Sequence, residues 1–166
     1  MKIYQLNIVV ILLFLAGLVL QVIQIPFYLN LSDSEPQGIY RLIPLDSHLK
    51  KGDLIIMKVP AQARPYVYGR GWLPNGGLLL KNVGAMTGDQ VTITNDKILI
   101  NQNDAGPVFQ LDRQGRPLPK LRGSFRIQSG YFLPLATAVP NSFDGRYFGP
   151  VPLRVIVGEA KPFLIF

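Results

Sequence analysis

The sequence predicts an all-β, partly barrel-like domain on one transmembrane helix at the amino terminus. From residue 40 onward, short apolar runs alternate with turn residues, and the chain contains 16 glycines and 14 prolines. This composition favours strands and turns over helices. Before residue 33, by contrast, no charged residue follows Lys2. We therefore divide the chain into an anchor, residues 1–29, and a β-rich domain, residues 30–166.

The anchor is predicted from the uncharged stretch Ile8–Ile25, which as a helix would be about 27 Å long, close to the thickness of the hydrocarbon layer. Pro26 ends this helix, because proline cannot continue its hydrogen bonds. The alternative is a cleaved signal peptide, but the stretch exceeds the usual apolar region of about 7–15 residues and no Ala-x-Ala follows it. Lys2 on one side and Asp33 on the other favour an amino terminus in the cytoplasm and a domain outside it.

Six segments of the domain have the pattern of strands, and two long loops form a small accessory region. The predicted strands are Leu54–Met57, Leu78–Val83, Val91–Thr94, Lys97–Ile100, Tyr131–Leu133 and Val151–Val157. Asn95 and Asp96 form a two-residue hairpin turn. The loops Pro60–Gly77 and Asp104–Gly123 lack helical periodicity. The final segment, Phe163–Phe166, either closes the sheet or contacts the membrane.

Charge and composition limit the partners. The formal net charge is +7, but the basic residues are scattered, with no run longer than Lys50–Lys51. We therefore expect a basic surface near anionic membrane lipid and no nucleic-acid partner. The absence of cysteine excludes disulfides and thiolate metal sites. No His, Asp and Glu residues cluster at ligand spacing, so neither a metal nor a cofactor is expected.

A serine and a lysine are the candidate catalytic residues, since a single histidine leaves Ser/His and Cys/His chemistry poorly supplied. A serine hydroxyl needs a base, and a lysine amine can be that base when burial keeps it neutral. Lys81 follows three leucines and, by strand alternation, shares a face with Leu79 and Val83. The alternative is a strand-end lysine whose ammonium group reaches water.

The candidate nucleophile is Ser34, in a Ser-Glu-Pro-Gln-Gly segment just after the predicted anchor. Pro36 restricts φ and Gly38 permits a positive φ, so this loop can hold the hydroxyl exposed and aim backbone N–H groups at an oxyanion. The alternative is an ordinary linker in which Ser32 and Ser34 are turn residues.

A third group lies in Ser-Phe-Asp-Gly-Arg-Tyr. In an extended segment Asp144 and Arg146 share a face and can form an ion pair, and the hydroxyl of Ser142 on the same face can reach the lysine amine. The alternative is a surface turn at Gly145.

Together, three segments resemble the membrane-anchored Ser/Lys signal peptidases, and most closely the conjugative-transfer branch, the TraF type. These segments are Ser34–Tyr40, Lys81–Asp89 and Ser142–Pro150. The resemblance implies a signal-peptidase-like, partly open β-barrel. It also implies that Ser34 is the nucleophile, Lys81 the general base and Ser142 the residue that orients the amine. Asp144 and Arg146 would brace the site, and Ser32 would assist the Ser34 N–H in binding the oxyanion.

The same resemblance implies a serine endopeptidase of the bacterial inner membrane, with its catalytic domain in the periplasm. Its substrate would be a leader-bearing membrane protein, such as the prepilin of a conjugative pilus or transfer system. Some members resolve the acyl-enzyme with an amine, which gives a cyclic or ligated product.

Two departures from the housekeeping type I signal peptidases favour a specialised substrate. In those enzymes a methionine follows the nucleophilic serine, whereas Glu35 and Pro36 follow Ser34 in this chain. They also carry Gly-Asp-Asn-Arg before the third motif, where this chain has residues 136–141. The alternatives are a housekeeping signal peptidase and a catalytically silent, membrane-anchored assembly subunit of a transfer channel. The presence of both Ser34 and Lys81 argues against the silent subunit.

Overall fold

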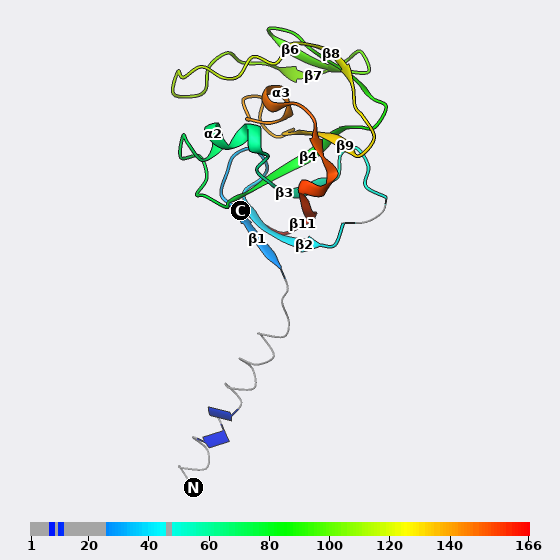
Figure 1. The fold of residues 1–166 in the computed structure, drawn as a ribbon. Helices are drawn as coiled ribbons and strands as arrows, with labels where there is room; N and C mark the ends of the chain where they lie inside the picture. Colours follow the sequence, from blue (N-terminus) through cyan, green and yellow to red (C-terminus); the bar gives the residue numbers. More distant parts are fainter. Residues whose placement is uncertain (1–6, 9, 12–25, 46–47) are drawn as a thin grey trace.

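The computed structural model describes residues 7–8, 10–11, 26–45 and 48–166, and from residue 26 onward it consists of two antiparallel sheets (Figure 1). In strand order, the larger sheet contains β1 (Phe27–Asn30), β2 (Gly38–Ile43), β11 (Ile156–Ile165), β3 (Leu54–Lys58), β4 (Leu78–Met86), β9 (Tyr131–Leu135) and β10 (Val151–Pro152). The smaller sheet contains β7 (Asn103–Pro107), β6 (Lys97–Ile100), β5 (Gln90–Ile93) and β8 (Gly123–Arg126). The all-β prediction is confirmed for this part of the chain.

The larger sheet is an open half-barrel with β1 and β10 at its two edges. β11 lies between β2 and β3, where Leu164 pairs with Ile39 and Ile165 with Gly38. The carboxyl-terminal segment therefore extends the sheet. At the centre of the sheet, Ile55 of β3 pairs with Lys81 of β4, which places this lysine among buried strands.

Of the buried apolar clusters, one joins the two sheets and another lies on the larger sheet. The smaller sheet packs on β9 and on the helix α3 (Gly145–Phe148), and Figure 1 shows it lying above both. This core contains Val91, Ile93, Ile98, Leu133, Leu135 and Tyr147. The other core, on the larger sheet, contains Ile55, Met57, Val83, Phe132 and Val151. Each fully buried aliphatic or aromatic side chain contributes about 1.5–3 kcal/mol, so these cores supply much of the stability of the domain.

The predicted strands agree with β3, β4, β5, β6 and β9, and the hairpin turn at Asn95–Asp96 is closed by a bond from Thr94 N to Lys97 O. The stretch Val151–Val157 is not one strand, as the sequence had suggested. It divides into β10, the 3-10 turn η2 (Leu153–Val155) and β11, because Pro152 has no N–H to continue a ladder and instead precedes the turn.

Neither predicted loop is wholly irregular. Pro60–Gly77 contains the short helices η1 (Ala61–Ala63) and α2 (Arg64–Val67), whose length is too small to create a detectable helical period. Pro65 lies in the first turn of α2, where its missing N–H costs nothing. The other loop begins within β7.

Most of the predicted anchor lies outside the described residues. Within the described ranges, no helix is long and apolar enough to cross a bilayer. Residues 27–29, which the sequence analysis assigned to the end of the anchor, belong to β1, and Tyr28 OH donates to Leu78 O at 2.8 Å.

Candidate active site

The loop between β1 and β2, which we call the serine loop (residues 31–37), is organised by the side chain of Asn30. This side chain is buried, and its Nδ2 donates to the carbonyls of Ser32, Glu35 and Pro36 at 3.1, 3.0 and 3.0 Å. Its Oδ1 accepts from Ser32 N at 3.1 Å and from Ser32 Oγ at 2.7 Å. One amide therefore binds four backbone polar groups of the loop. Sequence analysis missed Asn30, although an asparagine at a strand end is a known turn former.

Gly38, the first residue of β2, directly follows the serine loop, and close packing requires glycine there. A Cβ at this position would lie 2.3 Å from Leu164 O of the neighbouring strand. The expected positive φ is absent, since Gly38 is an ordinary strand residue.

Ser34 is half-buried at the centre of the loop, and its Oγ lies 3.1 Å from Ser32 Oγ. Ser32 Oγ is therefore adjacent to the hydroxyl of the predicted nucleophile, where a donor to the oxyanion is expected. Ser34 Oγ is hydrogen-bonded to Ser32, not to Lys81. Catalytic hydrogen bonds are often long before substrate binds, so the lack of a Ser34–Lys81 bond here does not argue against Lys81 as the base of Ser34.

Lys81 lies inside the domain, as strand alternation predicted, with 2% of the residue exposed. Its Nζ donates to Ser142 Oγ at 2.8 Å, as the sequence also predicted. Burial lowers the Lys81 pKa to about 8, against the opposing effects of Asp144 and Glu35. The neutral amine is therefore far more populated near neutral pH than in a free lysine, and Ser142 orients the amine by accepting one of its hydrogens.

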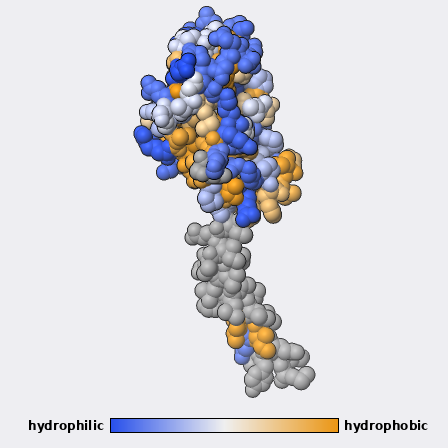
Figure 2. Space-filling model, turned by 90° about the vertical axis from the view of Figure 1, so that its right-hand side faces the viewer, coloured by the Kyte–Doolittle hydropathy of each residue, from blue (hydrophilic) through white to orange (hydrophobic). Residues whose placement is uncertain are grey.

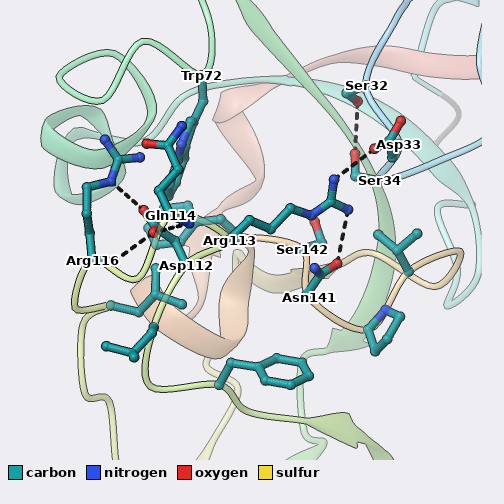
Figure 3. Close-up of a pocket in the computed structure, with 16 residues that line it drawn as sticks. Ser32, Asp33, Ser34, Trp72, Asp112, Arg113, Gln114, Arg116, Asn141 and Ser142 are labelled. Carbon is teal, nitrogen blue, oxygen red and sulfur yellow. Dashed lines mark hydrogen bonds and ion pairs between the residues drawn. The ribbon is translucent and has the colours of Figure 1, made fainter.

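Two neighbouring cavities meet at these residues. Ser32, Ser34, Lys81 and Ser142 all line a cavity of about 540 Å³ beside β1 and β4. A second cavity of about 680 Å³ shares Ser32, Ser34 and Ser142, and Trp72 forms part of its apolar wall (Figure 3). Ser34 therefore lies where the two cavities adjoin.

Asp144 and Arg146 form the buried ion pair that the sequence predicted, with 2.7 Å between Asp144 Oδ2 and Arg146 Nη2. They do so at a helix start and not in an extended segment. Asp144 is the N-cap of α3 and accepts from Arg146 N at 3.1 Å and from Ala136 N at 2.8 Å. Arg146 Nη1 donates to Pro140 O at 2.6 Å and to Pro107 O at 3.0 Å. The pair therefore holds the segment that carries Ser142.

Gly145, suggested as the centre of a surface turn, is buried. A Cβ there would lie 2.6 Å from Pro134 O, so only glycine allows α3 to approach β9 this closely.

Glu35 is a second residue that sequence analysis missed as part of the site. The residue is 4% exposed, and its Oε1 accepts from Asn82 Nδ2 at 2.6 Å and from Thr137 N at 3.2 Å. Burial raises the Glu35 pKa, while these two donors and Lys81 act against the increase. Its carboxylate thus lies between the serine loop and the strand that carries Lys81. The only sequence signal was a charged residue in the position where housekeeping enzymes have methionine.

Arg113 reaches the site from the accessory region. Its guanidinium donates to Asp33 Oδ2 at 2.9 Å and to Asn141 Oδ1 at 3.2 Å, and it crosses between the serine loop and the residue before Ser142 (Figure 3). The arginine lowers the Asp33 pKa by hydrogen bonding and charge. Both side chains are more than half exposed, so this bridge contributes little to stability.

The fold and the three motifs agree with one family of proteins. Residues 2–165 match the model of the signal peptidases, peptidase family S26, and the chain belongs to this family. The chain is 32% identical over 149 residues to the conjugal transfer protein TraF of Agrobacterium fabrum, covering 84% of this chain and 83% of that protein. It is 35% identical over 149 residues to the TraF protein of Agrobacterium tumefaciens, with the same coverage.

A plasmid transfer protein TraF of Escherichia coli is 31% identical over 146 residues, and the match covers 81% of each chain. Among solved structures, a signal peptidase I of Enterococcus faecalis superposes with a TM-score of 0.41 at 17% identity, covering 69% of this chain and 97% of that one. The predicted resemblance to TraF-type signal peptidases is therefore confirmed by the family match and by the TraF relatives.

Proposed function

We propose that this chain is a membrane-anchored serine endopeptidase that removes the leader from a precursor protein of a conjugative transfer system. The observation that carries the proposal is the buried amine of Lys81. It is held by Ser142 at 2.8 Å, its pKa is lowered to about 8, and it lines the same cavity as Ser34. A lysine in this state has the property that a general base for a serine needs.

In the proposed reaction, Lys81 Nζ takes the proton of Ser34 Oγ as the oxygen attacks the carbonyl carbon of the scissile peptide bond. The Ser34 N–H and Ser32 Oγ donate to the oxyanion that forms. When the intermediate collapses, the C–N bond breaks and the Lys81 ammonium returns the proton to the leaving amine. An ester remains between Ser34 Oγ and the acyl group of the fragment on the amino-terminal side of the broken bond. Attack by water releases an acid, whereas attack by an amine forms a new amide.

The proposed substrate is a leader-bearing membrane protein of the prepilin kind. The relatives named as conjugal or plasmid transfer proteins support this class. The two apolar-walled cavities around Ser34 suit an extended, largely apolar segment.

The proposed location is the bacterial inner membrane, with the domain in the periplasm. Apolar side chains remain exposed in or directly after β1 and at or directly after the end of β11: Phe27, Leu29, Leu31, Phe163, Leu164, Ile165 and Phe166. Figure 2 shows apolar surface toward the lower end of the globular part. Contact with lipid would cover these exposed apolar side chains.

Co-expression of the full chain with a pilin precursor encoded in the same transfer region tests the proposal. Intact-mass analysis should show loss of the leader, with Ser34→Ala as the matched control that leaves the precursor uncut. A cyclic product would be lighter than a linear one by one water. If a general secretory preprotein is cut equally well, the enzyme is a housekeeping peptidase. If neither precursor is cut, the chain is an assembly subunit and the proposal is wrong.

A further inference from the structure

Glu35 joins the three segments that build the site. It directly follows Ser34, and its Oε1 accepts from Asn82 Nδ2 at 2.6 Å and from Thr137 N at 3.2 Å. Asn82 directly follows Lys81 on β4, and its Nδ2 also donates to Thr137 Oγ1 at 3.0 Å. One buried carboxylate thus connects the serine loop, the lysine strand and the segment after β9.

The charge of Glu35 is not offset by a cation of its own. The two donors to its Oε1 are neutral, and among the described residues it forms no ion pair. The charged groups that face the Lys81 amine are Glu35, Asp144 and Arg146. The last two are paired with each other at 2.7 Å, so their charges largely offset one another. Glu35 is therefore the carboxylate whose charge acts on Lys81 with least compensation.

Among the described residues, Tyr40 of β2 is a further titratable group on which the charge of Glu35 acts. Its OH donates to Pro36 O at 2.6 Å, and both burial and the Glu35 charge raise its pKa. Tyr40 therefore stays neutral in the range where Lys81 titrates, and it adds no competing charge.

We propose that Glu35 is a positioning residue, which clamps the serine loop to the Lys81 strand and stabilises the Lys81 ammonium that forms when the amine takes the Ser34 proton. The inference rests on the proposed function of Ser34 and Lys81. Its physical basis is that a carboxylate beside a buried ammonium favours the charged form. The base thereby becomes a better proton acceptor in a site whose burial alone would disfavour the ammonium.

The first test measures how the charge of Glu35 affects the titration of Lys81, and it needs no substrate. The full chain in detergent micelles carries lysine labelled with carbon-13 at Cε, and the Lys81 signal is identified by its absence in Lys81→Met. Glu35→Gln keeps an oxygen acceptor at the same position and removes the charge, so the titration midpoint of Lys81 should move to lower pH. Asp33→Asn, an exposed carboxylate on the other side of Ser34, should leave the midpoint at the wild-type value. An unchanged midpoint in Glu35→Gln overturns the inference.

A second variant keeps the test decisive if the buried amide disturbs the loop. Glu35→Met has similar length, no charge and no buried polar group, and it should move the Lys81 midpoint in the same direction. Asn82→Ala removes the hydrogen bond from Asn82 to Glu35 but keeps the carboxylate. The Lys81 titration midpoint of this variant should therefore stay above that of Glu35→Gln. If Glu35→Met also titrates as the wild type does, Glu35 has no electrostatic role.

The second test is kinetic and uses the same pilin precursor. Glu35→Gln and Glu35→Met should lower kcat by roughly 10-fold to 100-fold with little change in KM, the range expected for losing a hydrogen-bonded charge. The acid limb of kcat/KM should move to lower pH together with the midpoint from the first test. A limb that stays in place contradicts the inference. If Ser34→Ala or Lys81→Met still cut the precursor, the proposed function fails. If both are inactive while the limb of the Glu35 variants is unmoved, the Glu35 inference alone fails.

Discussion

Lys81 and Ser142 are joined by a buried hydrogen bond of 2.8 Å between Nζ and Oγ, although 61 positions separate them in the chain. Lys81 lies at the centre of β4, and Ser142 lies in the segment held by the Asp144–Arg146 pair. The bond leaves the lone pair of the neutral amine available for the Ser34 proton. This hydrogen bond therefore orients the amine of the proposed base.

Ser142→Ala should lower kcat by roughly 10-fold to 100-fold and leave KM nearly unchanged, because the amine loses its acceptor and adopts several orientations. Ser142→Thr retains a hydroxyl and should recover much of the rate. Ser124→Ala, which removes an exposed hydroxyl bonded to Thr92 on the smaller sheet, is the matched control. Wild-type kinetics in Ser142→Ala would show that the bond has no part in the reaction.

Ser34→Ala and Lys81→Met should each lower leader cleavage by on the order of 10³-fold or more, while the protein still folds and inserts. The double variant should be no worse than either single variant, since nucleophile and base act as one unit. Lys51→Met, at an exposed ion pair with Asp89, is the control for loss of a lysine. Cleavage is followed by intact mass, and near-wild-type cleavage in either single variant would refute the assignment.

Ser32→Ala should lower kcat by about 10²–10³-fold with substrate affinity preserved, because one donor to the oxyanion is lost. Ser32 also donates to Asn30, so a looser loop is the competing explanation. Gln37→Ala separates the two, because it removes loop contacts to Leu31 and Asp33 without touching a hydroxyl near Ser34. Equal losses of kcat in Ser32→Ala and Gln37→Ala would mean that Ser32 acts only through loop structure.

Activity should rise with pH through about 8. Burial lowers the pKa of Lys81 to about 8, and only the neutral amine accepts a proton, so the active fraction is small below this pH and saturates above it. A free lysine would place the same limb near 10.4. The profile of His48→Gln, measured on a detergent-solubilised substrate, should keep this limb. If the limb disappears in His48→Gln, the base is the histidine and the Ser/Lys pair is wrong.

Asp144→Asn and Arg146→Met should each destabilise the domain by about 3–5 kcal/mol, because each leaves an unpaired buried charge. The measurement is chemical denaturation of the full chain in detergent. Lys51→Met breaks an ion pair whose lysine is half exposed and should cost about 1 kcal/mol or less. If Asp144→Asn destabilises the domain no more than Lys51→Met does, the buried pair does not hold the segment that carries Ser142.

The sequence by itself determined the fold class, most strands, and the candidate residues Ser34, Lys81 and Ser142. Strand alternation was enough to predict that Lys81 points inward, because the faces of a strand follow from a local period of two. The Asp144–Arg146 pair was also predictable from spacing, although its helical geometry was not. In each case the information lies within a few neighbouring residues.

Only the tertiary structure decided the partners of Glu35 and Arg113. The bonds of Glu35 to Asn82 and Thr137 span 47 and 102 positions, and no local pattern encodes the register that brings them together. The same holds for Arg113, whose loop crosses to Asp33 from 80 positions away. Such contacts depend on the pairing of β4 with its neighbours and on the approach of the accessory region. The electrostatic setting of the lysine therefore emerges only when the sheets are assembled.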